Sequence, residues 1–104
     1  MRVAFSFDDI ADQQDLKEKL AGKFSSLDKF LTHLPPELQQ ASVRVTKGNR
    51  WGYRVVATVP LPKREVAAEA EDKELLTAID QVVNRLSAEL RKRWEKLRAK
   101  RARL

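Results

Sequence analysis

The sequence predicts an α+β fold, a two-layer β-α-β-β-β-α sandwich in which two helices cover one face of a four-stranded sheet. Three observations predict it: an alternating segment at the start of the chain, two segments with helical apolar spacing, and three β-rich runs between them. The 104 residues can close one hydrophobic core and are too few for two. We therefore expect a single domain over residues 1–104.

The first two elements follow from two different apolar periods. Residues 2–7 alternate between apolar and smaller or polar side chains, which is typical of a strand with one buried face. In residues 15–34 the apolar side chains recur at intervals of three and four, which predicts a helix that ends at Pro35 and Pro36. The apolar residues of this helix are Leu16, Leu20, Phe24, Leu27, Leu31 and Leu34.

Three strands are predicted next, over residues 42–47, 53–59 and 65–70, because these runs are rich in β-branched residues or alternate in polarity. Residues 48–52 and 60–63 connect them with turn-forming glycine, asparagine and proline. Connections this short indicate an antiparallel meander.

The last element is a long helix predicted over residues 73–100, with Asp72 as its N-cap. Its 28 residues would span ~42 Å at 1.5 Å per residue, more than one small sheet can cover. We therefore expect a basic C-terminal extension, about residues 91–104, to project from the domain. Its apolar stripe consists of Leu75, Leu76, Ile79, Val83, Leu86, Leu90, Trp94 and Leu97.

Charge is concentrated at the end of the chain. The net charge is +6, and residues 85–104 carry nine basic against two acidic side chains. Such a field attracts polyanions, so nucleic acid or an anionic membrane surface is the leading class of partner. No segment approaches the roughly 20 apolar residues that a membrane-spanning helix needs, so we expect a soluble, cytoplasmic protein without a membrane partner.

Four cations of the long helix fall on one line. At 100° per residue, Arg85, Lys92, Lys96 and Arg103 lie within an arc of ~40°, roughly 110–130° from the centre of the apolar stripe. We call these four residues the cationic row and predict that it contacts the phosphates of a nucleic acid. The alternative is a solvated helix face whose cations suit the negative helix C-terminus.

Two further sites are candidates for nucleic-acid contacts. Lys23 lies at the border of the first helix's apolar arc, where its ammonium reaches either a partner or only solvent. In the loop 48–52, Trp51 beside Arg50 suits stacking on a base while the cation holds a phosphate. The alternative for Trp51 is that it folds back over the open face of the sheet.

Catalysis finds little support in the sequence. His33 is the only histidine, no cysteine occurs, and no glycine-rich phosphate loop or nucleophile motif is present. The acidic residues between 65 and 74 are explained by a strand that leads into a helix start. We therefore expect no enzyme activity, no cofactor, no metal site and no small-molecule substrate.

Three segments carry a family resemblance. Tyr53-Arg54-Val55, the run 66–70 and Leu76-Thr77-Ala78-Ile79-Asp80 resemble the ribosome hibernation-promoting factors and the ribosome-associated inhibitors. The resemblance extends over residues 16–98, although Leu76 and Ala88 stand where the family has a tyrosine and a basic residue. Lys23, Lys29, Arg85, Lys92 and Lys96 match cations that face ribosomal RNA in the family.

The resemblance implies a short-form hibernation factor. Such a protein binds the small ribosomal subunit and its ribosomal RNA near the decoding centre, where it blocks messenger and transfer RNA. It regulates translation by occupancy, without chemistry.

Two alternatives stay open. One is a protein-interaction module that forms a homodimer through Trp94 and Leu97 of the projecting helix. The other is a generic binder of double-stranded RNA, because the predicted fold resembles double-stranded-RNA-binding domains.

Overall fold

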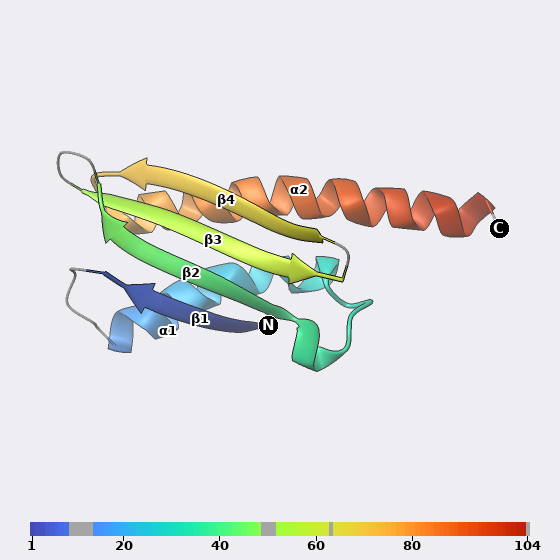
Figure 1. Ribbon diagram of the computed structural model, residues 1–104, viewed down its shortest axis with the longest axis horizontal. Coiled ribbons are helices and arrows are strands. Elements are labelled where there is room, and N and C mark those ends of the chain that lie inside the picture. Colours follow the sequence, from blue (N-terminus) through green and yellow to red (C-terminus); the bar gives the residue numbers. More distant parts are fainter. Residues whose placement is uncertain (9–13, 49–51, 63, 104) are drawn as a thin grey trace.

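The computed structural model describes residues 1–8, 14–48, 52–62 and 64–103 (Figure 1). It confirms the predicted β-α-β-β-β-α order, with both helices on one face of a four-stranded sheet. The elements are β1 (Arg2–Phe7), α1 (Gln14–Phe24), η1 (Ser25–Phe30), η2 (Pro36–Leu38), β2 (Gln40–Lys47), β3 (Tyr53–Leu61), β4 (Arg64–Asp72) and α2 (Leu75–Arg103).

The sheet has the strand order β1-β2-β3-β4. β1 runs parallel to β2, because the chain crosses over the sheet through α1 before it returns as β2. β2, β3 and β4 form the predicted antiparallel meander, in which Val43 lies opposite Ala57 and Ala57 opposite Ala68. The sheet is therefore mixed, with β1 and β4 at its two edges.

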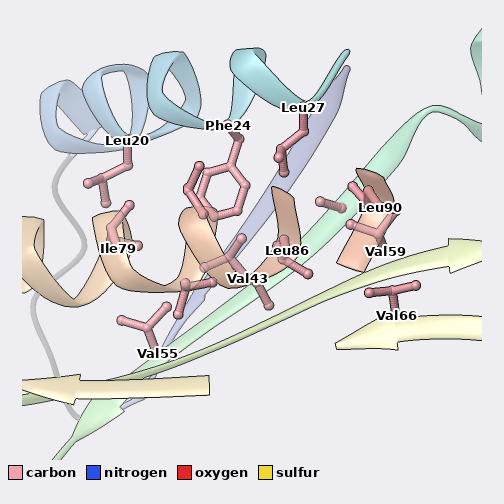
Figure 2. Packing of buried hydrophobic residues seen from close by; sticks show 14 of the residues in the cluster. Leu20, Phe24, Leu27, Val43, Val55, Val59, Val66, Ile79, Leu86 and Leu90 are labelled. Carbon is pink, nitrogen blue, oxygen red and sulfur yellow. The ribbon is translucent and has the colours of Figure 1, made fainter. Parts of the chain in front are cut away.

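The core lies between the sheet and the two helices. Figure 2 shows Phe24 of α1 among side chains from α2 and from the sheet, including Ile79 and Val43. These three side chains are almost fully buried, and the described residues include no buried polar or charged residue. Hydrophobic burial of this kind is the main force that holds the helices on the sheet.

The first helix differs from the prediction. The α-helix ends at Phe24, and the chain continues as the 3₁₀-helix η1 up to Phe30. The Ser25 hydroxyl donates to the Gly22 carbonyl at 2.6 Å and the Ser26 hydroxyl donates to the Lys23 carbonyl at 3.3 Å. Serine side chains that bond to backbone carbonyls three residues earlier compete with the α-helical pattern, which explains the tighter turn.

The start of the last helix was also predicted two residues too early. Asp72 is the final residue of β4, and its Oδ1 accepts a hydrogen bond from the Glu74 backbone N–H at 3.0 Å. α2 begins at Leu75, and in Figure 1 its last turns extend beyond the ends of the strands. Charged side chains interrupt it, and in the described part of the chain no helix is long and apolar enough to cross a membrane.

One glycine fixes the hairpin end of the sheet. Gly52 has φ +99°, a backbone conformation that residues other than glycine rarely adopt. A Cβ there would lie 2.6 Å from the Asp72 backbone oxygen and 2.9 Å from the Lys73 Cα. The start of β3 therefore packs directly on the junction between β4 and α2.

Candidate nucleic-acid interface

The structure exposes the three members of the cationic row whose side chains it describes. Arg85, Lys92 and Lys96 are exposed, whereas Leu86 and Leu90 of the same helix are buried against the sheet. Burial of the apolar stripe therefore turns these cations outward, as the helical spacing predicts. Arg103 is the last residue of α2, and its side chain lies outside the described part of the structure.

Lys92 and Lys96 lie toward the projecting end of α2. The Lys92 ammonium lies 3.8 Å from a carboxylate oxygen of Glu89, one helical turn earlier, and 71% of the Lys92 side chain is exposed. A pair this exposed is worth little and exchanges readily with other ions. Within the described residues Lys96 makes no ion pair, so both ammonium groups are accessible to a polyanion.

Arg85 is placed differently. Its Nη1 donates a hydrogen bond to the backbone carbonyl of Glu69, on the edge strand β4. The guanidinium is thereby anchored beside the sheet, a contact that the sequence did not predict. To bind a phosphate, the Arg85 guanidinium would have to use its remaining N–H groups or break its hydrogen bond to the Glu69 carbonyl.

Lys23 of α1 contacts a different side of α2 from the one that carries the cationic row. Its ammonium is 2.9 Å from a carboxylate oxygen of Asp80, which joins α1 to α2. At 100° per residue Asp80 lies about 140° around α2 from Arg85. The structure therefore separates Lys23 from the cationic row. Lys29 is exposed on η1, with its ammonium 5.2 Å from the centre of the Phe30 ring.

The loop candidates remain predictions. Arg50 and Trp51 belong to residues 49–51, which lie outside the described part of the structure. The two interpretations of Trp51, stacking on a base or covering the sheet, therefore both stand.

The helix-free face of the sheet carries two arginines that the sequence analysis did not select. The Arg44 Nε donates to Asp8 Oδ2 at 2.6 Å, and the Arg54 Nε donates to Glu69 Oε1 at 2.7 Å. Arg44 and Arg54 line a hollow in this face together with Thr46 and Val56. Alternation within 42–47 was the available signal, because it sets Arg44 on the face opposite the buried valines.

The Arg54–Glu69 pair perturbs both groups. The hydrogen bond from Arg54 to the carboxylate holds the pKa of Glu69 below its ordinary value and raises the pKa of Arg54. Both side chains are about half exposed, so solvent screens this pair. Arg44 and Arg54 each have a carboxylate partner, which reduces their free positive charge.

His33, which lies between η1 and η2, contacts Trp94 of α2. Their ring centroids are 5.7 Å apart with a tilt of 40°. Trp94 is partly buried and packs on the core, whereas His33 is exposed. Trp94 therefore contacts its own chain, and its contact with a second copy stays a prediction.

The candidate interface is built from cationic side chains. Among the described residues, no three His, Asp or Glu side chains gather closely enough to hold a metal ion. Lys92 and Lys96 offer accessible ammonium groups, which bind anionic oxygens by Coulomb attraction and hydrogen bonds.

The sequence of this chain matches a known family, and its fold matches solved structures. Residues 3–98 match the family described as sigma 54 modulation protein / S30EA ribosomal protein. The N-terminal domain of Protein Y from Thermus thermophilus superposes with a TM-score of 0.73 and 22% identity over 88% of this chain and 98% of that one. A ribosomal subunit interface protein from Coxiella burnetii gives 0.70 and 19% over 88% and 96%. No curated protein sequence matches.

Proposed function

The chain belongs to the sigma 54 modulation protein / S30EA ribosomal protein family, and from this membership we propose that it is a hibernation factor of the small ribosomal subunit. In this proposal it binds small-subunit ribosomal RNA near the decoding centre. There it blocks messenger and transfer RNA, so that idle ribosomes stay inactive in the cytoplasm. The two structural relatives, a Protein Y domain and a subunit interface protein, support this proposal by their shared fold.

The match over residues 3–98 carries the assignment to ribosomes, and the exposure of Arg85, Lys92 and Lys96 supports the choice of RNA as the surface bound. Lys92 and Lys96 are exposed in the second half of α2, the helix whose last turns extend beyond the ends of the strands in Figure 1. Flexible ammonium groups of this kind neutralise phosphates without reading bases. The proposed inhibition accordingly requires occupancy alone and no bond making or breaking.

The number of phosphates neutralised is measurable. The logarithm of the association constant falls with the logarithm of salt by about 0.7 to 0.9 per phosphate, so five cations predict a slope of roughly −3.5 to −4.5. Lys23 and Arg85 already have partners within the chain. If they keep those partners, Lys29, Lys92 and Lys96 alone predict roughly −2.1 to −2.7.

Co-sedimentation with purified small subunits tests the proposal. We expect Lys92→Glu/Lys96→Glu to weaken association by at least about tenfold and to reduce the salt slope by roughly 1.4 to 1.8. The double change Arg64→Glu/Arg91→Glu is the matched control, because it reverses two exposed cations outside the cationic row with the same change in net charge. Equal binding by the row variant and wild type would contradict the proposed contact.

Competition separates this function from generic binding of double-stranded RNA. Bound transfer RNA on the small subunit is expected to exclude the protein, whereas a large excess of an unrelated RNA duplex is not. If the duplex displaces the protein as well as free small subunits do, the generic binder is the better description.

A further inference from the structure

The outer edge of β4 is a strand edge without a partner strand. Among the strands that the structure describes, β4 pairs with β3 alone, and it is nine residues long. An edge strand presents unpaired backbone N–H and C=O groups, which can template the addition of another extended chain.

The register identifies the residues whose backbone groups face outward. Residues 62–63 connect β3 to β4, and Leu61 faces Arg64 across this two-residue turn. Residues that flank such a turn exchange both backbone hydrogen bonds, and bonded pairs then alternate along an antiparallel ladder. Bonded pairs thus recur at every second residue of β4 from Arg64. The residues between them, whose backbone groups point to the outer edge, are Glu65, Ala67, Glu69 and Glu71.

An independent contact agrees with this assignment. The Arg85 guanidinium of α2 donates to the Glu69 carbonyl, one of the outward-facing groups. The edge of β4 therefore already accepts a cationic hydrogen-bond donor in this structure. An added strand would need the same Glu69 carbonyl as an acceptor, so the Arg85 side chain competes with strand addition at this edge.

Charge defines the kind of chain that fits. The four outward-facing residues expose their side chains on the helix-free face, and three of the four are glutamates. A second copy of β4 would set glutamates opposite glutamates, which is unfavourable, whereas lysine or arginine opposite them forms favourable cross-strand pairs. Arg54, which pairs with Glu69 on this face, shows the same complementarity within the chain.

We propose that the outer edge of β4 binds an extended, lysine- or arginine-rich peptide segment as an additional strand, with Arg85 as the group that must yield the Glu69 carbonyl. Backbone hydrogen bonds supply the pairing, and the three glutamates select a basic chain. The inference concerns a protein partner and a surface other than Lys92 and Lys96, so it stands or falls independently of the proposed ribosomal RNA contact.

Amide hydrogen exchange of the full chain tests the site directly. The probe is a capped nine-residue peptide of alternating threonine and lysine, and its counterpart alternates threonine and glutamate. Without peptide, the outward-facing amides of Glu65 and Ala67 are expected to exchange faster than those of Val66 and Ala68, which bond to β3. We expect the basic peptide to slow exchange at Glu65 and Ala67, and the acidic peptide to have no effect.

Two kinds of variant separate the contribution of the backbone from that of the charge. Ala67→Pro removes one outward N–H and is expected to abolish peptide binding, while Ala67→Ser retains it. Glu65→Lys/Glu71→Lys keeps every backbone group and is expected to reverse the preference toward the acidic peptide. This second variant tests the site even if the proline variant fails to fold.

Arg85→Gln is expected to strengthen peptide binding, whereas Ala67→Pro is expected to abolish it. The shorter side chain releases the Glu69 carbonyl, so the basic peptide is expected to bind about two- to tenfold more tightly, the range of one net hydrogen bond. Equal protection by both peptides, or no protection by either, would overturn the proposal. Protection of the β4 amides in the absence of peptide, together with a protein mass twice that of one chain, would also overturn the proposal, because a second copy of the chain would then occupy the edge.

Discussion

The Lys23 ammonium lies 2.9 Å from a carboxylate oxygen of Asp80 and thereby joins α1 to α2, although 57 positions separate the two residues in the sequence. The Lys23 side chain is 31% exposed and that of Asp80 55%. An ion pair at this level of exposure contributes little stability. Its larger effect is on Lys23 itself, because a carboxylate partner competes with any phosphate for the ammonium.

Asp80→Asn therefore tests whether Lys23 is an RNA contact. Removal of the carboxylate frees the ammonium, so we expect tighter association with small subunits and a salt slope steeper by about 0.7 to 0.9. The free energy of unfolding is expected to change by less than about 1 kcal/mol. Co-sedimentation across a salt series and urea unfolding measure the two effects. Lys23→Gln/Asp80→Asn is the control, and a slope that is equal in both variants would remove Lys23 from the interface.

Gly52→Ala is predicted to destabilise the protein. A Cβ at Gly52 would meet the Asp72 carbonyl oxygen at 2.6 Å, and the φ of +99° is unfavourable for alanine. Strain of this kind costs about 1–3 kcal/mol. Urea unfolding measures the loss, and Gly22→Ala is the control because nothing lies within 4 Å of its Cβ position. The control should be neutral or gain up to about 1 kcal/mol in α1; an equal effect in both variants would exclude the close contact at Gly52.

Local patterns were sufficient to predict the elements of this fold. The runs 42–47 and 53–59 were correctly predicted as strands, and the apolar stripe of residues 15–34 includes Phe24, Leu27 and Leu31, which the structure buries in the core. The helix type after Phe24 was not predicted, because two serine hydroxyls compete there with the α-helical pattern.

Within the candidate site, the sequence could predict only the features that follow from the geometry of a single helix. The outward direction of Lys92 and Lys96 follows from helical geometry and burial of the apolar stripe within α2. The partners of Lys23 and Arg85 depend on how α1, α2 and β4 pack together, which no spacing within one segment records. The spacing within α2 therefore predicted the exposure of Arg85, Lys92 and Lys96, but it could not identify the contacts of Lys23 and Arg85.

The Arg54–Glu69 pair predicts a dependence of stability on pH. Its hydrogen bond lowers the pKa of Glu69 in the folded state relative to the unfolded state. The pair therefore contributes stability above the unfolded glutamate pKa of about 4.3, and this contribution is lost as pH falls through the lower folded pKa. We expect the difference in unfolding free energy between wild type and Glu69→Gln to shrink toward zero as the solution is acidified below about pH 4.3. A difference that stays constant with pH would show that the pair is not formed in solution.

Trp94→Ala tests whether the projecting helix serves a homodimer. Trp94 is partly buried against its own chain and contacts His33 at a ring-centroid distance of 5.7 Å. We expect the mass in sedimentation equilibrium to equal that of wild type, and the unfolding free energy to fall by less than the about 3–5 kcal/mol that a fully buried aromatic costs. His33→Ala removes only the ring contact and should cost less. If Trp94→Ala instead converts a dimer to a monomer while small-subunit binding persists, the helix end is a protein-interaction surface, and the RNA contact must be confined to other residues.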